Sequence, residues 1–523
     1  MKKIIPKKGI IFFIANLLNR SKFATIYAKV FRMDKSEKYK QAFLFHQQGK
    51  LTAARDIYLE ILQSEPDNHE VLDLLGVLFL QAGEYKRCED CINKAIEIHP
   101  EPYYLENLAK LYSKTNRYQD AIEVYKILTK AEPLNYEYQF GLAMAYKNNS
   151  DWTNAKRAYY KAIELNPKSH ESYFNLAYLH FNENDPQGAV KCYEKALEIL
   201  PDDWETKYFL SLAYMQVKNY KDGLKYFEER LCRQSAIVSQ EKTYPNLMKE
   251  KPLWTGREDL SDKVLYTYYE AGFGDLIMLY RFMPELTSKC KKVIFKPQRE
   301  LVELFRENSY GAEIMDMFEF EKDVYFDYHL PFLSLPYVLG KSGKDVFIHH
   351  DDGYLKANSE KVQQYKQKYF DNDKFKIGIK WQGNTFYDKE RVLKVEDFFR
   401  LFEIPNTQFY SCQTFEGSEK FEKIKDRYNV IDLAPTFKNF SDTAAALENL
   451  DLIICNDTSL VHLGGAMRRA CWVLLPHVYN WRWHDDLSKC DWYDSVKIFR
   501  QTSNGDWDGV FAEVEKELRK ILN

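Results

Sequence analysis

The sequence predicts an α-helical repeat solenoid followed by two α/β lobes with parallel sheets. Prolines recur every 33 or 34 residues from Pro66 to Pro201, and after about residue 235 short apolar runs alternate with helical patterns instead. The length of 523 residues fits about three or four domains. A hydrophobic content of 45% is typical of a folded globular protein. The formal net charge of −3 argues against nucleic acid as a partner.

A basic segment opens the chain. Residues 1–33 hold eight basic residues and no acidic one, and an apolar run over 10–18 lies between the basic clusters. This run is too short to cross a bilayer, and no small-residue cleavage site follows it. We predict a basic helix over residues 1–34, either attached to the anionic inner face of the membrane or packed on the protein with a solvated basic face. The cysteines are scattered and odd in number, which indicates the cytoplasm.

Three further positions recur with the prolines. Two are small and would let antiparallel helices approach, the third is large and would fill the groove between them, and the proline would end the second helix. Counted back from the prolines, they are Ala42, Gly76, Ala109, Ala143 and Ala177; Ala54, Cys88, Ala121, Ala155 and Ala189; and Tyr58, Ile92, Tyr125, Tyr159 and Tyr193. This pattern resembles the tetratricopeptide repeat.

We therefore expect five clear tetratricopeptide repeats and a weaker sixth, through Ser211, Gly223 and Phe227, within residues 35–235. Such arrays bind protein partners on an extended concave face. Cys88 falls on a small packing position, so we interpret the Cys88-x-x-Cys91 pair as packing rather than as half of a zinc site.

The sequence pattern of the remaining chain predicts two lobes, over residues 236–372 and 373–523. Apolar runs predict strands over 263–268, 292–295 and up to 331 in the first lobe, with an apolar helix over 276–286. In the second lobe they predict strands over 376–381, 408–413 and 450–455, and the polar stretch 357–374 separates the lobes. Two such sheets in sequence suggest two Rossmann-like domains facing across a cleft, with ligands at the carboxyl ends of the strands.

Two turns between a strand and a helix are candidate sites. Asp457, Thr458 and Ser459 precede a helical pattern over 460–467, whose N-terminus could hold phosphates or could simply be capped by Asp457 or Ser459. His462, one turn further on, could face a phosphate or pack. In the first lobe, Gly272-x-Gly274 would let a ligand approach the backbone, and Asp275 is either a general base or a helix cap.

Motifs over the whole C-terminal half carry a second resemblance. In order they are Trp254-Thr255-Gly256, Gly272-Phe273-Gly274-Asp275, Phe326-Asp327-Tyr328-His329, Leu333-Ser334-Leu335-Pro336, Trp381-Gln382-Gly383-Asn384, Phe440-Ser441-Asp442-Thr443-Ala444, Asp457-Thr458-Ser459, His462-Leu463, Trp481-Arg482-Trp483 and Trp492-Tyr493. Their order and spacing resemble bacterial proteins that join tetratricopeptide repeats to a glycosyltransferase of the heptosyltransferase superfamily, which has the two-lobed GT-B fold. The layout is also similar to that of protein O-linked N-acetylglucosamine transferases, although the local motifs fit the heptosyltransferases better.

The resemblance implies roles for individual residues. Asp275 would be the catalytic base that deprotonates an acceptor hydroxyl, with the acceptor on the first lobe. The nucleotide-sugar donor would lie on the second lobe, its diphosphate held by Asp457, Thr458 and Ser459, with His462 nearby. Further donor-binding residues would be Arg391, Lys394, Asn384 and Gln413. GT-B enzymes generally need neither a metal nor another cofactor, and the sequence has no His/Cys cluster typical of zinc.

Two departures from the family's motifs leave two functions open. The usual Glu-Gln-Gly is Glu270-Ala271-Gly272 here, and the usual Arg-Ser is Arg391-Val392. The first hypothesis is a glycosyltransferase that moves a sugar from a nucleotide-diphosphate donor to a hydroxyl of a lipopolysaccharide, a polysaccharide or a protein. The alternative is a repeat scaffold whose GT-B half is vestigial or only senses a nucleotide.

Overall fold

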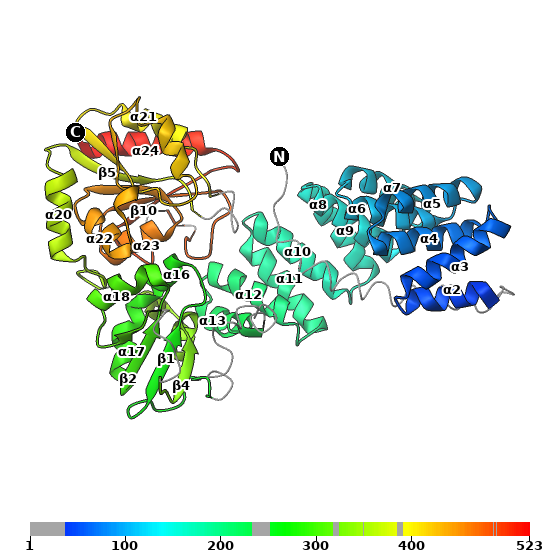
Figure 1. Cartoon of the computed structure of the whole chain (residues 1–523), viewed down its shortest axis with the longest axis horizontal. Helices are drawn as coiled ribbons and strands as arrows, with labels where there is room; N and C mark the ends of the chain where they lie inside the picture. The colour runs from blue at the N-terminus through cyan, green and yellow to red at the C-terminus, as the bar shows by residue number, and fades with distance from the viewer. Residues whose placement is uncertain are drawn as a thin grey trace. The chain divides into compact units, whose positions relative to one another are not determined.

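The computed structural model describes residues 37–232, 251–316, 324–348, 350–383, 391–484, 486–487 and 489–522 (Figure 1). The chain divides into two compact units, Met1–Leu179 and His180–Asn523. The predicted basic helix over residues 1–34 and the predicted site residue Asn384 lie outside the described residues. Within the described ranges, no helix is long and apolar enough to cross a membrane.

Antiparallel helical hairpins make up residues 37–227. Their helices are α2 Glu37–Gln47, α3 Leu51–Ser64, α4 His69–Ala82, α5 Tyr85–Ile98, α6 Pro102–Lys114, α7 Tyr118–Ala131, α8 Tyr136–Asn148, α9 Trp152–Leu165, α10 His170–Asn182, α11 Pro186–Ile199, α12 Trp204–Gln216 and α13 Tyr220–Phe227. Helices α3, α5, α7, α9 and α11 each end two residues before a proline of the period. Proline therefore ends these helices as the sequence predicts.

The recurring small residues lie where the two helices of a hairpin cross. A Cβ atom added to Gly76 of α4 would come within 2.6 Å of Ile92 Cγ1 and 3.4 Å of the Cys88 carbonyl oxygen, both on α5. Cys88 is fully buried, and burial raises the pKa of its thiol to about 12. This cysteine therefore fills a packing position. The weak sixth hairpin has the same close crossing, because a Cβ atom at Gly223 would meet the Ser211 carbonyl oxygen at 3.2 Å.

Two parallel sheets form the C-terminal part. The first has the order β3-β2-β1-β4 and the second the order β10-β9-β8-β5-β6-β7, with all neighbouring pairs parallel. Their strands are β1 Val264–Tyr268, β2 Lys292–Lys296, β3 Glu313–Ile314, β4 Tyr328–Pro331, β5 Phe375–Lys380, β6 Thr407–Ser411, β7 Val430–Asp432, β8 Leu452–Asn456, β9 Cys471–Leu475 and β10 Val496–Arg500. Counted within each sheet, the order is 3-2-1-4 in the first and 3-2-1-4-5-6 in the second, which is the order of doubly wound α/β folds.

Helices cover these sheets (Figure 1). In the first lobe they are α16 Phe273–Leu279, α17 Met283–Lys289, α18 Val302–Glu307 and α19 Leu335–Val338; in the second lobe they are α21 Phe399–Phe402, α22 Phe440–Glu448, α23 Ser459–Ala466 and α24 Trp507–Leu522. The polar stretch between the lobes contains a helix, α20 Ser359–Tyr369, which packs against α22.

Two hydrophobic cores stabilise the second sheet. On one face Ile377, Ile379 and Trp381 belong to one buried core with residues of α24 such as Phe511. On the other face, residues of both sheets join a single larger core that includes Leu265 of β1 and Ile453 of β8. The two lobes therefore share buried apolar contacts, so the carboxyl ends of β1 and β8 are held close to each other.

Candidate functional site

The two predicted turns between strand and helix meet in space. Helix α16 follows β1, helix α23 follows β8, and the two helices pack against each other. A Cβ atom at Gly274 of α16 would lie 2.7 Å from Cδ2 of His462 on α23, so only glycine lets the helices come this close. We call the charged residues around this crossing the inter-lobe cluster: Asp275, Arg391, Asp457, His462 and Arg482.

Asp457 pairs with Arg391 rather than capping α23. Arg391 Nη1 lies 3.0 Å from Asp457 Oδ2 and 3.3 Å from the Asp457 carbonyl oxygen. The Asp457 side chain is only 4% exposed, so a cation is required beside it. Asn456 Nδ2 donates to the Arg391 carbonyl oxygen at 2.8 Å, which fastens the loop after β5 to the end of β8. Arg391 and Asp457, both expected from the resemblance to bind the donor, therefore lie in direct contact with each other.

The N-cap residue of α23 leaves the first amides of the helix uncapped. This residue is Thr458, and its side chain accepts no hydrogen bond from the amides of the first turn within the described part of the chain. Thr458 and Ser459 are both partly exposed. A Cβ atom at Gly383 would lie 3.0 Å from Thr458 Cγ2, so the turn after β5 runs directly beside this N-terminus. Uncapped amides at the start of a helix, next to an arginine, can bind an anion.

Asp275 forms an ion pair with Arg482. The Arg482 guanidinium donates to the Asp275 carboxylate, and the side chains are 15% and 20% exposed respectively. Burial lowers the pKa of Arg482 to about 10, and its Nε atom has no hydrogen-bond partner among the described residues. Arg482 was not among the predicted site residues, although the Trp481-Arg482-Trp483 motif was a signal. It brings a second cation to the cluster.

His462 is packed between aromatic rings. Its ring stacks on that of Trp483 with centroids 5.6 Å apart, and its Nδ1 lies 3.0 Å from the Tyr493 hydroxyl. Its Nε2 is 3.8 Å from Asp457 Oδ1. Burial lowers the pKa of His462 to about 4 against the opposing charge of Asp457, so the imidazole is neutral near pH 7. The described contacts are those of a packing residue that supports Asp457.

Of the other predicted donor-binding residues, the structure describes Gln413 and Lys394. Gln413 is buried, and its side chain accepts hydrogen bonds from the amides of Trp381 and Gln382 at 3.1 and 2.9 Å. It therefore fixes the turn after β5. Lys394 is exposed at the start of the short helix Val395–Phe398, three residues beyond Arg391.

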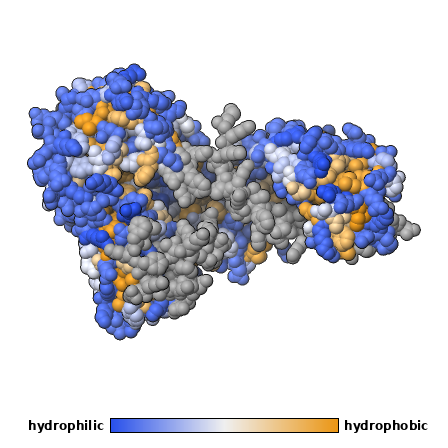
Figure 2. All heavy atoms as spheres, viewed as in Figure 1, coloured by the Kyte–Doolittle hydropathy of each residue, from blue (hydrophilic) through white to orange (hydrophobic). Residues whose placement is uncertain are grey.

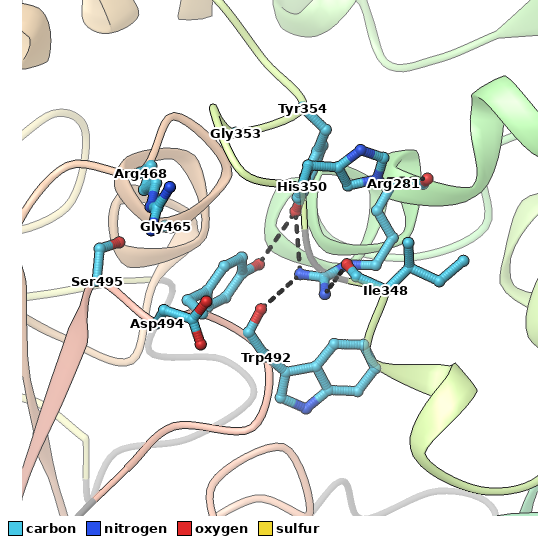
Figure 3. A pocket seen from close by; sticks show the side chains of 11 residues that line it. Arg281, Ile348, His350, Gly353, Tyr354, Gly465, Arg468, Trp492, Asp494 and Ser495 are labelled. Atoms are coloured by element: carbon cyan, nitrogen blue, oxygen red, sulfur yellow. Dashed lines mark hydrogen bonds between the residues drawn. The ribbon is translucent and has the colours of Figure 1, made fainter.

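Arg281 joins the two lobes beside the cluster. It is 1% exposed, and Figure 3 shows its guanidinium directed at the Trp492 carbonyl oxygen and the Tyr354 hydroxyl, at 3.0 and 3.4 Å. The pocket that it lines there has a volume of about 20 Å³, which is room for about one water molecule and not for a nucleotide sugar. Arg281 thus holds the lobes together, a role that the sequence did not reveal.

The described residues include no group of three or more His, Cys, Asp or Glu side chains arranged to hold a metal ion. The inter-lobe cluster instead offers carboxylates, guanidinium groups and the amides of a helix N-terminus. Such groups can hold an anionic ligand and accept a proton.

Comparison with known proteins confirms the repeats. Residues 45–111, 107–170 and 170–203 match models described as tetratricopeptide repeat. No curated protein matches the chain. The repeats indicate protein–protein interaction or scaffolding, and Figure 2 shows hydrophobic residues gathered on the visible face of the first repeats.

Several solved structures are similar to part of this chain. MamA from Desulfovibrio magneticus RS-1, from residue 41 to its end, has a TM-score of 0.30 at 19% identity and covers 32% of this chain and 98% of its own. A tetratricopeptide repeat protein from Parabacteroides merdae ATCC 43184 has a TM-score of 0.32 at 19% identity and covers 40% of this chain and 78% of its own. YrrB, described as a TPR protein with an unusual peptide-binding site, has a TM-score of 0.30 at 17% identity and covers 35% of this chain and 95% of its own.

Proposed function

We propose that the chain is a GT-B glycosyltransferase that moves a sugar from a nucleotide-diphosphate donor to an acceptor hydroxyl of a glycan or a protein. The tetratricopeptide repeats would recruit the acceptor or a protein partner. One observation carries the proposal: α16 and α23 cross at Gly274 and His462, which brings Asp275 of one lobe and Asp457–Ser459 of the other into one cluster with two arginines.

The position of this cluster in the sheets supports the proposal. In doubly wound sheets, ligands bind beyond the carboxyl ends of the strands, where the strand order reverses. In the second sheet that point lies between β5 and β8, and the residues that follow these strands include Arg391 and Asp457. A nucleotide diphosphate is an anion of the kind that Arg391 and the first amides of α23 would hold.

The reaction assigns each group a step. As the acceptor oxygen attacks the anomeric carbon, Asp275 takes the hydroxyl proton, and the bond from that carbon to the diphosphate oxygen breaks. Arg391 and the amides of Thr458 and Ser459 stabilise the charge that develops on the departing diphosphate. A carboxylate paired with a guanidinium is a weak base. We therefore infer that Arg482 transfers its contact from Asp275 to the donor phosphate before the proton moves.

A non-catalytic scaffold is the second candidate. Two observations favour it. Asp275 is paired with Arg482, and Val392, the residue after Arg391, has no hydroxyl group. In that case the cluster would bind a nucleotide without transferring a sugar, or would bind none.

The test begins with a thermal-shift panel of nucleoside diphosphates and nucleotide sugars. A ligand at about 100 times its Kd adds about 2.7 kcal/mol to the free energy of unfolding, so one donor should raise Tm measurably. Nucleotide release is then measured with that donor and a range of glycan and peptide acceptors.

For the Asp275→Asn variant we expect nucleotide release to fall at least about 100-fold, because the general base is lost, while the donor still binds at least as tightly as to the wild type. Lys38→Gln, on the exposed face of α2, is the control and should release nucleotide at the wild-type rate. Undiminished release by Asp275→Asn would remove this residue from the mechanism. Donor binding without any release by the wild type would favour the scaffold.

A further inference from the structure

The last helical hairpin shares the hydrophobic core of the α/β lobes. Met215 of α12 and Tyr220 and Leu224 of α13 belong to the same buried cluster as residues of both sheets. Helix α13 packs against α19 of the first lobe. We propose that this hairpin is a positioning element of the inter-lobe cluster, which holds the loop before Asp275 through Arg230 and the loop of Arg482 through Tyr220. The reaction that the cluster performs is taken from the proposed function, whereas the contacts of the hairpin do not depend on it.

The first hold is a buried ion pair. Arg230, just after α13, donates through Nη2 to Glu270 Oε1 at 2.6 Å and to the Ser334 hydroxyl at 2.8 Å. The side chains of Arg230 and Glu270 are 8% and 3% exposed. Glu228 Oε1 accepts a hydrogen bond from the same guanidinium at 2.7 Å, and the Ser334 hydroxyl donates to Glu228 Oε2 at 2.7 Å. The end of the repeats is thus connected to the first lobe by a buried polar network.

Glu270 connects this network to Asp275. It lies in the loop between β1 and α16, two residues before Gly272, the N-cap residue of α16. Its Oε1 also accepts the Leu333 amide at 3.1 Å, so the carboxylate is held from two sides. Arg230 therefore fixes the start of the short helix whose first turn carries Asp275.

The second hold reaches the other lobe. The Tyr220 hydroxyl lies 2.8 Å from His484 Nε2, and both side chains are buried. His484 is two residues after Arg482. Beside it, Lys218 Nζ lies 2.6 Å from Asp491 Oδ2, which adds a partly exposed ion pair to the same loop region.

The contacts of Arg230 and Tyr220 fix the loops that carry the two partners of one ion pair, Asp275 and Arg482. Asp275 and Arg482 come from different lobes, and their relative position depends on the loops that Arg230 and Tyr220 contact. A hairpin that contacts both loops supplies the supporting interactions that a preorganised site requires.

The main experiment removes one hydroxyl from the full-length chain. Tyr220→Phe loses its hydrogen bond to His484 but keeps the ring, and Tyr159→Phe, whose buried hydroxyl contacts Met144 Sδ in the fourth repeat, is the matched control. Hydrogen–deuterium exchange is followed in peptides that cover residues 480–484 and 268–276. We expect about fivefold faster exchange over 480–484 in Tyr220→Phe alone, since one buried hydrogen bond is lost. Wild-type exchange there would overturn the proposal.

A double-variant cycle tests the Arg230 hold. Arg230→Met leaves Glu270 buried without its cation and should speed exchange over 268–276, whereas adding Glu270→Gln should restore part of the protection. An Arg230→Met protein with wild-type exchange in this peptide would overturn the proposal. If Arg230→Met fails to fold, Tyr220→Phe and Glu270→Gln alone decide the question.

Nucleotide binding separates this inference from the proposed function. With the donor found in the thermal-shift panel, Tyr220→Phe should weaken affinity about threefold to tenfold at an unchanged melting temperature of the repeats. Faster exchange with unchanged affinity would overturn the positioning role. If the wild type binds no nucleotide, the transferase proposal fails, and the exchange measurements still show whether the hairpin holds the two loops.

Discussion

At the scale of single residues, His462 is a histidine that the folded protein keeps neutral. It lies between Trp483, Tyr493 and α16, and burial lowers its pKa from 6.5 to about 4. Between these two pH values the unfolded chain binds a proton that the folded chain excludes. Stability contributed by this residue is therefore complete above pH 6.5 and is lost as the pH falls towards 4.

This difference predicts a pH dependence. The pKa change corresponds to about 3 kcal/mol in the free energy of unfolding at low pH, and His462→Gln should remove most of that pH-dependent part. Denaturant unfolding of both proteins at pH 7, 6, 5 and 4 measures it. His46 in the repeats has a similarly lowered pKa of about 4, and it contributes equally to both proteins. The quantity compared is therefore the difference in the free energy of unfolding between wild type and His462→Gln at each pH. A difference that stays constant from pH 7 to pH 4 would contradict the prediction.

Local sequence patterns identified four of the five residues in the inter-lobe cluster. Asp275, Asp457, His462 and Arg391 follow strands or begin helices, so their positions could be predicted from local patterns. Arg482 and Arg281 could not be assigned, because each acts through a partner more than 200 positions away. The role of Gln413 was also hidden: its contacts are with backbone groups of a neighbouring strand end, which no local pattern encodes.

At the scale of elements, the crossing of α16 and α23 depends on Gly274. Gly274→Ala places a methyl group 2.7 Å from the His462 ring, and since overpacking of this kind costs about 1–3 kcal/mol, we expect a lower Tm. Gly272→Ala is the matched control. Its added Cβ atom would meet only Asp275 Oδ2, at 3.7 Å, and its φ of −69° suits alanine. Differential scanning calorimetry of both variants tests this, and equal melting temperatures would contradict it.

Long elements with a clear period were predicted best. The repeats were predicted from their period and are confirmed, and the predicted strands correspond to β1, β2, β4, β5, β6 and β8. Strands β3 and β7, with two and three residues, depend on pairing with β2 and β6, so their own sequences carry too little signal. The apolar helix expected over 276–286 is divided into α16, the short 3-10 helix Tyr280–Phe282 and α17, because Pro284 lies in the first turn of a new helix.

At the scale of the whole molecule, the shared core makes the α/β lobes depend on the end of the repeats. A fragment that begins at residue 251 lacks Met215, Tyr220 and Leu224, and leaves the lobe residues around them exposed to water. We expect it to melt at least about 5 °C below a fragment of residues 180–523, or to aggregate, because several buried apolar side chains are lost. Equal melting temperatures by circular dichroism would contradict this.

The basic segment at residues 1–33 belongs to the same scale. Its eight positive charges would attract anionic lipid, so deletion of these residues should reduce co-sedimentation with phosphatidylglycerol vesicles several-fold at low salt. Neutral phosphatidylcholine vesicles are the control, and both proteins should bind them weakly. Equal sedimentation of the two proteins with anionic vesicles would contradict membrane attachment.

The division of the chain at residues 179 and 180 bears on how such a protein can change over evolution. Each early hairpin contacts mainly its neighbours through a packing pattern that repeats every 33 or 34 residues, so a whole hairpin can be duplicated or deleted by recombination without altering the register of the rest. The sixth hairpin cannot be duplicated or deleted in this way, because its buried residues belong to the core of both lobes. The array can therefore gain or lose length at its N-terminal side while its junction with the α/β part stays fixed.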